Sequence, residues 1–227
     1  GCPFGCTYCV WGDDALKKIR VRDIEIIHDE LEYVAKYSHG QASWIFADAN
    51  FGVLQRDVEI AQHIREIADR NGFPNSIHRW DSKNTTDRNI EISTILNNKE
   101  ALVALQSTDQ AVLERAGRGR IRFEHLKKQI RFFRESGVEL RTDVLLGLPG
   151  ESVESHLETL RDCFDLGFAQ INTHNIVMLP GSEYETEVQR EEFGIKTQFR
   201  PMFGAYGAYD EKLVFEIEEC VRSTNEM

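Results

Sequence analysis

The sequence predicts an α/β fold built on a parallel sheet, and two observations carry this prediction. Short apolar segments of strand-like composition alternate along the 227 residues with helix-like segments of roughly 10 to 15 residues. No long linker or low-complexity stretch separates them, so one domain over 1–227 is the simpler interpretation. A hydrophobic content of 41% is ordinary for a globular core.

Helices are expected where apolar residues recur at helical spacing and a glycine follows. The first begins at Asp23 and ends at His39-Gly40. The others are expected over 57–71, 88–96, 111–116, 123–136 and 152–166, followed by a helical stretch after Leu179-Pro180-Gly181 and helices from about 210 to 224. Five strands are expected, over 43–47, 76–80, 101–106, 138–146 and 170–178.

Charge and composition limit the partners. A net charge of -11 disfavours a nonspecific nucleic-acid binder, because phosphate contacts need a basic surface. The run 115–134 holds eight Lys or Arg against one Glu, which we interpret as a solvated helix face plus a basic loop. No apolar run approaches the roughly 20 residues that span a bilayer, so no membrane partner is expected. The five cysteines, an odd number, disfavour a disulfide framework and predict a reducing, cytoplasmic setting.

Three of these cysteines, Cys2, Cys6 and Cys9, stand in GCPFGCTYCVWG with C-x3-C-x2-C spacing. Thiolates are soft ligands that suit zinc, copper(I) and iron-sulfur clusters. A structural zinc ion prefers four closed ligands, and Cys163 and Cys220 form no pair of recognisable spacing. Three thiolates can hold three irons of a cubane cluster and leave the fourth iron open to a small molecule. An electron-transfer cluster module, which ordinarily uses four cysteines, and a zinc-stabilised interaction domain remain the alternatives.

This motif, with an aromatic residue before its last cysteine, resembles the signature of the radical S-adenosylmethionine (radical SAM) superfamily. The resemblance implies a 4Fe-4S cluster on Cys2, Cys6 and Cys9, with S-adenosylmethionine chelating the fourth iron. Reductive cleavage of the sulfonium then gives methionine and a 5'-deoxyadenosyl radical. It also implies a small-molecule or peptide substrate and an electron donor such as flavodoxin or ferredoxin. Tyr8 matches the aromatic position, which lies against the adenine side of the cofactor.

The resemblance further implies a partial (β/α)6 TIM-type barrel in which the cysteine loop follows the first strand. That strand would precede Gly1, so we expect 1–227 to be a radical SAM core domain truncated at its N-terminal edge, with about 195–227 as a C-terminal extension. In parallel α/β folds, ligands gather at the carboxyl ends of the strands.

Candidate S-adenosylmethionine contacts follow from the strand ends. Asp48, in DANFG, resembles an Asp-rich variant of the branch that carries a cobalamin-binding domain, and would pair with the methionyl ammonium. An ordinary Asx turn is the alternative.

The later strand ends supply further candidates. Gln106 and Ser107 would reach the ribose and carboxylate, and Arg118 would pair with the carboxylate, with Arg120 and Arg122 as alternatives. Val177 and Leu179 would form the adenine wall.

The resulting hypothesis is a radical SAM enzyme, with cobalamin-dependent methyl transfer to carbon suggested by the DANFG variant and the cobalamin domain lying outside this chain. Methylthiolation and radical rearrangement are alternatives. Lys83 and Asn84 could face the substrate, whereas His174, Cys163 and Cys220 are expected to be core residues.

Overall fold

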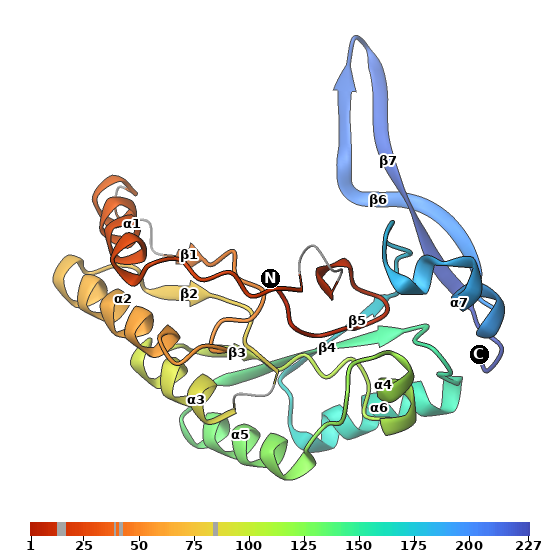
Figure 1. The fold of residues 1–227 in the computed structure, drawn as a ribbon, viewed down its shortest axis with the longest axis horizontal. Helices are drawn as coiled ribbons and strands as arrows, with labels where there is room; N and C mark the ends of the chain where they lie inside the picture. The colour runs from red at the N-terminus through yellow and green to blue at the C-terminus, as the bar shows by residue number, and fades with distance from the viewer. Residues whose placement is uncertain (13–16, 39, 41–42, 84–85) are drawn as a thin grey trace.

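The fold is described from a computed structural model, which covers residues 1–12, 17–38, 40, 43–83 and 86–227 (Figure 1). His39, the expected end of the first helix, and Asn84, a candidate substrate contact, lie outside these ranges.

The five expected strands are confirmed and are all parallel. β1 (Ser43–Ile45) pairs with β2 (Ser76–His78), and a second sheet has the order β3-β4-β5. Its strands are β3 (Glu100–Leu102), β4 (Glu139–Leu146) and β5 (Gln170–Asn175). Several are shorter than expected, although isolated bridges at Gln106 and Val177 carry two of them further along the chain. The parallel order agrees with the predicted partial barrel.

The expected helices are also confirmed up to residue 192. They are α1 (Ile24–Tyr37), α2 (Asp57–Asn71), α3 (Thr86–Ile95), α4 (Gln110–Arg115), α5 (Phe123–Glu135), α6 (Val153–Leu166) and α7 (Glu187–Glu192), with short 3-10 turns η1 (Val10–Gly12) and η2 (Glu183–Glu185). Local chemistry fixes several ends. The Asp109 carboxylate accepts hydrogen bonds from the first turn of α4, and Gly72 ends α2 in the left-handed conformation. None of these helices is long and apolar enough to cross a membrane, within the residues described.

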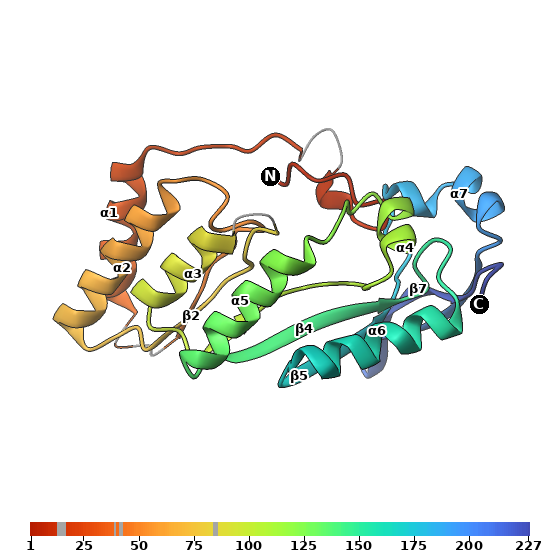
Figure 2. The same ribbon diagram turned by 90° about the horizontal axis from the view of Figure 1, so that it is seen from below.

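Two hydrophobic clusters pack the helices against one side of the strands. Ile64, Ile67 and Ile92 lie in the cluster between α1, α2, α3 and the β1-β2 pair. Phe133 and Val144 lie in the cluster between α5, α6 and the β3-β4-β5 sheet. Figure 2 shows these helices lining the outer side of the strands. The carboxyl ends of the strands are therefore left to face the cysteine loop.

The expected helices over 210–224 are wrong. β6 (Lys196–Tyr209) and β7 (Lys212–Ser223) form an antiparallel hairpin instead. Apolar Phe215 and Ile217 alternate with glutamates. Alternation of apolar and polar residues every second position is typical of a strand. Asp210 and Glu211 both have positive φ, as a two-residue hairpin turn requires.

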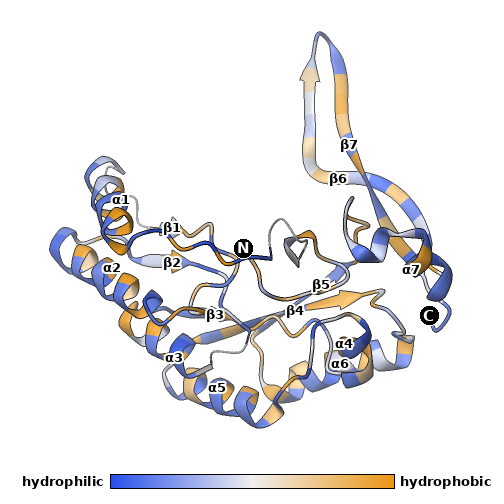
Figure 3. Cartoon of the chain, in the orientation of Figure 1, coloured by the Kyte–Doolittle hydropathy of each residue, from blue (hydrophilic) through white to orange (hydrophobic). Residues whose placement is uncertain are grey.

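The hairpin is joined to the body only near its base. The Met178 amide donates to the Glu219 carbonyl at 2.8 Å, and the Val221 amide donates to the Ile176 carbonyl at 2.9 Å. Its far end projects away from the body with several exposed apolar side chains (Figures 1 and 3). The hairpin falls within the expected C-terminal extension.

Candidate functional site

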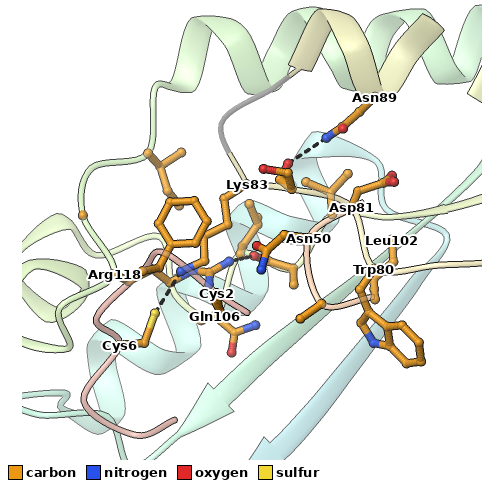
Figure 4. Close-up of a pocket in the computed structure, with 18 of the residues that line it drawn as sticks. Cys2, Cys6, Asn50, Trp80, Asp81, Lys83, Asn89, Leu102, Gln106 and Arg118 are labelled. Atoms are coloured by element: carbon orange, nitrogen blue, oxygen red, sulfur yellow. Dashed lines mark hydrogen bonds between the residues drawn. The ribbon is translucent and has the colours of Figure 1, made fainter. Parts of the chain in front are cut away.

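A cavity of about 1250 Å³ lies at the carboxyl ends of β1, β2 and β3. The cysteine loop lines one part of it, and the strand ends, the segment 118–122 and α5 line the rest. Figure 4 shows Lys83 joined to Cys6 by a hydrogen bond, Arg118 beside Lys83 and Trp80 at the far side of the view. A cavity of this size, framed by converging loops, is the default place for a ligand in such a fold.

The cysteine loop is held by backbone hydrogen bonds to two distant segments. The Thr7 amide donates to the Ala116 carbonyl at 3.0 Å, and the Thr7 carbonyl accepts from the Tyr184 amide at 2.8 Å. Within the loop, the Cys9 amide donates to the Cys6 carbonyl at 3.1 Å. Because Thr7 is fixed from both sides, the neighbouring thiols are presented to the cavity by a supported backbone.

All three thiols of the motif line the cavity and form no disulfide. Cys6 is buried, while Cys2 and Cys9 are partly exposed. The Lys83 ammonium lies 2.9 Å from the Cys6 sulfur and 4.2 Å from the centre of the Phe4 ring. Lys83 is therefore part of the cysteine site, a role that its position after β2 did not indicate.

The electrostatics of the site favour a thiolate at Cys6. Burial opposes ionisation, but attraction and hydrogen bonding from Lys83, helped by Arg118, hold the pKa of Cys6 below its ordinary value. Burial, reinforced by Arg118, lowers the pKa of Lys83. At Cys9 burial raises the pKa of the thiol. The pKa values of the Cys6 and Cys9 thiols are thus shifted in opposite directions.

The donor set fits an iron-sulfur cluster. No group of three His, Cys, Asp or Glu converges closely enough to hold a metal ion among the residues described. A zinc ion needs its thiolates about 2.3 Å from one point, whereas a cubane cluster distributes its cysteines over separate irons. Three thiols that line one cavity without converging on a single point match the second requirement better.

The structure brings four of the predicted cofactor-binding residues to this cavity: Tyr8, Asp48, Gln106 and Arg118. Gln106 has φ of 72° and is buried at the end of the third strand segment. The Asp48 carboxylate accepts from the Asn50 backbone amide at 2.8 Å, which is the Asx turn considered as the alternative. Asp48 nevertheless also lines the cavity.

Among the three candidate arginines, Arg118 is the one beside the cysteine loop. Its guanidinium donates to the Ala104 carbonyl, and its charge acts on both Cys6 and Tyr8. Arg120 is largely exposed and pairs with Glu114 at 2.8 Å. Arg122 also lines the cavity, but from the start of α5.

The other predicted contacts lie elsewhere. Ser107 is fully buried, and its hydroxyl lies 3.2 Å from the Thr159 hydroxyl and accepts from the Asp109 amide. Val177 and Leu179 are not among the residues that line the cavity, because the chain there runs beside β7. His174 is exposed rather than in the core, 3.5 Å from Asp143, whereas Cys163 and Cys220 are buried as expected.

Sequence reasoning missed two buried polar groups on the cavity wall. The side-chain amide nitrogen of Asn50, Nδ2, and the Ser82 hydroxyl have no hydrogen-bond partner among the described residues. A buried polar group without a partner is costly, which marks both as groups that a ligand can satisfy. Both follow strands, so attention to every polar residue at a strand end would have found them.

Gly117 supports the cysteine loop by having no side chain. A Cβ at this position would lie 2.2 Å from the Gly5 carbonyl oxygen, and φ is +63°. We expect Gly117→Ala to displace the loop and to speed loss of iron from the reconstituted protein by about tenfold, the effect of on the order of 1.4 kcal/mol of strain.

The matched control for this prediction is Gly119→Ala, measured by the same iron-release assay. Gly119 also has positive φ, at +79°, but a Cβ there would meet nothing within 4 Å. Equal iron loss in the two variants would show that backbone conformation, and not contact with the cysteine loop, accounts for the effect.

A parallel partial barrel with three cysteines facing a cavity at its strand ends defines the radical SAM class. The family model for the radical SAM superfamily matches residues 1–163, and the chain belongs to this superfamily. The family uses a 4Fe-4S cluster and S-adenosylmethionine.

The chain is similar to two methyltransferases of that class. It is 29% identical over 100% of its length to the cobalamin-dependent radical SAM methyltransferase TokK of Streptomyces tokunonensis, covering 34% of that protein. It is 31% identical over 87% of its length to the 2-(S-pantetheinyl)-carbapenam-3-carboxylate methyltransferase of Streptantibioticus cattleyicolor, covering 29%. A third relative, the tRNA-2-methylthio-N(6)-dimethylallyladenosine synthase of Staphylococcus aureus, is 32% identical over 77% of the chain and 35% of that protein.

A solved structure supports the fold. The radical SAM methyltransferase TsrM from Kitasatospora setae, determined with cobalamin and a [4Fe-4S] cluster, superposes with a TM-score of 0.69. Its sequence identity is 17%, over 84% of this chain and 35% of TsrM. The chain spans about a third of the length of each of these proteins.

Proposed function

We propose that Cys2, Cys6 and Cys9 of this chain hold a 4Fe-4S cluster and that the chain cleaves S-adenosylmethionine bound beside it. The observation that carries the proposal is the placement of all three thiols on the wall of one large cavity at the strand ends. When bound, the cluster supplies the electron that splits the sulfonium into methionine and a 5'-deoxyadenosyl radical. An electron-transfer module has no need of a cavity of about 1250 Å³ next to its cysteines.

The chain's own residues would bind and orient the cofactor. Asp48 offers a carboxylate for the methionyl ammonium, and Arg118 offers a guanidinium for the carboxylate. Asn50 and Gln106 supply amides to the polar part of the molecule, and Tyr8 packs its ring beside the cysteine loop. Lys83 donates to the Cys6 sulfur, and it could keep this contact when iron occupies that sulfur, because a metal-bound thiolate still accepts hydrogen bonds.

The reaction that we propose for the whole protein is cobalamin-dependent methyl transfer to carbon. Support comes from DANFG and from similarity to two methyltransferases, one of them cobalamin-dependent, over most or all of the chain. The cobalamin would be held by a part of the protein outside 1–227. The electron would come from a donor such as flavodoxin or ferredoxin, and the substrate would be a small molecule or peptide.

Anaerobic reconstitution of the full-length protein tests the proposal. We expect about four irons and four sulfides per chain, and release of 5'-deoxyadenosine when S-adenosylmethionine and dithionite are added. An intact cluster that releases no deoxyadenosine would favour the electron-transfer alternative. Zinc as the only bound metal would contradict both iron-based functions.

Methylthiolation is the second candidate, because the chain is also similar to a methylthio-transferring synthase. The two reactions differ in product mass, since one adds a methyl group and the other a methylthio group. They also differ in cofactor demand. Dependence of turnover on added cobalamin would support methyl transfer and contradict methylthiolation.

A further inference from the structure

One face of α5, together with the residue just before the helix, presents three polar side chains to the cavity. Arg122, His125 and Gln129 all line it, together with the apolar Leu126. Their spacing of three and four residues places them along one stripe of the helix. This stripe, Arg122-His125-Gln129, belongs to a different element from the strand ends that carry the proposed S-adenosylmethionine contacts.

Gln129 is the most informative member of the stripe. Its residue is 6% exposed, and its amide atoms are not among the fully buried side-chain atoms that lack a partner, so they keep contact with solvent at the cavity. An amide in such a place can exchange water for a new hydrogen-bond partner when a ligand enters. Because Gln129 lines the cavity, a bound molecule can supply that partner.

The charge on this wall is positive and partly uncompensated. Two acidic side chains already form ion pairs with other residues: Asp87 pairs with Lys128 at 2.5 Å, and Glu114 pairs with Arg120 at 2.8 Å. The Arg122 guanidinium forms no ion pair with a described residue. Arg122 is also the N-cap residue of α5 and its side chain makes no capping hydrogen bond, so the first backbone amides of this 13-residue helix have no side-chain cap from it.

The Arg122-His125-Gln129 stripe is separate from Lys83 and Arg118, the two cations beside the cysteine loop. Arg118 donates to the Ala104 carbonyl, just after β3, whereas Arg122, His125 and Gln129 belong to α5 and the residue before it. A single carboxylate, such as that of the methionyl group, occupies one guanidinium. The cavity therefore provides a second place for negative charge.

We propose that the Arg122-His125-Gln129 stripe binds an oxyanion of the substrate, a carboxylate or a phosphate. The inference rests on the proposed function, because it assigns the rest of the cavity to S-adenosylmethionine. A guanidinium and an uncapped helix start attract the anion. The imidazole N–H and the Gln129 amide then complete its hydrogen bonds and set the orientation of the substrate in the cavity.

Calorimetric titration of the reconstituted full-length protein with inorganic phosphate and, separately, with succinate tests this site. We expect at least one of the two to bind, and Arg122→Ala and Gln129→Leu each to weaken that binding by about tenfold, since a hydrogen bond to a charged group is lost. Which probe binds more tightly identifies the oxyanion. The control is Arg131→Ala on the same helix, an exposed arginine that does not line the cavity.

Saturating methionine distinguishes the two anion sites. The proposal predicts that phosphate or succinate binds equally well in its presence, because methionine occupies the region of Arg118. Displacement by methionine, wild-type affinity in Arg122→Ala, or the absence of binding by either probe would overturn it.

Deoxyadenosine release by the same wild-type preparation separates this inference from the proposed function. Release of deoxyadenosine without oxyanion binding contradicts only the proposal that the stripe binds an oxyanion. Oxyanion binding without release contradicts the proposed function, and with it the assignment of the stripe to a substrate of radical chemistry.

Discussion

Cys6→Ala should abolish the cluster and reduce iron from about four per chain to background. Cys6 is the middle ligand of the motif, is buried, and lies between Lys83 and the loop backbone. Its loss leaves two thiols for a cluster that needs three protein ligands, and places the Lys83 ammonium beside the site with no thiolate to balance its charge. Deoxyadenosine release should fall to the level without enzyme.

Iron and sulfide analysis, with the visible absorption of the reconstituted protein, measures this result. Cys163→Ala is a matched control, because Cys163 is also buried but lies on the core-facing side of α6 and does not line the cavity. It should retain full iron content at some cost in stability. A Cys6→Ala protein that keeps four irons and releases deoxyadenosine would contradict the ligand assignment.

Glu151→Ala is expected to destabilise the protein by about 3 to 5 kcal/mol, because it removes one partner from a buried polar network. The Glu151 carboxylate is fully buried, accepts from the Gly147 amide at 2.9 Å and lies 3.1 Å from the His156 ring nitrogen. Tyr184 donates its hydroxyl to the Gly147 carbonyl at 2.8 Å. The turn after β4 is therefore held on both sides by side chains that no water can replace.

Urea unfolding followed by circular dichroism measures the change in free energy. Glu151→Gln should cost less, since an amide oxygen can still accept from Gly147. Glu158→Ala, on an exposed position of α6, should change the unfolding free energy by no more than about 0.5 kcal/mol. Equal losses in Glu151→Ala and Glu158→Ala would contradict the role of the buried network.

The loss of this turn should also reach the cysteine loop. The Tyr184 amide donates to the Thr7 carbonyl, and the Tyr184 ring packs in the cluster that includes Tyr8 and Leu148. The Gly-Leu-Pro-Gly turn, interpreted from sequence as structural, thus supports the cysteine loop from a distance of more than 100 residues along the chain.

Much of the fold was predictable because its signals are local. Apolar spacing, a capping Asp109 and the glycines after α2 and α6 lie within a few residues of the elements they define. The hairpin was missed where two local signals compete. Its glutamates suit a helix, whereas the alternation of Phe215 and Ile217 with them suits a strand, and pairing with β6 and Ile176 decides for the strand.

The sequence by itself determined the cysteine motif and the class of protein, because both depend on residue type and on spacing within eight residues. Only the tertiary structure decided which distant side chains join them. It placed Lys83 against Cys6, chose Arg118 over Arg120 for the cysteine loop, buried Ser107 against α6 and turned the α5 stripe toward the cavity. These contacts depend on how helices and strands pack across long sequence separations, and no local pattern records that packing.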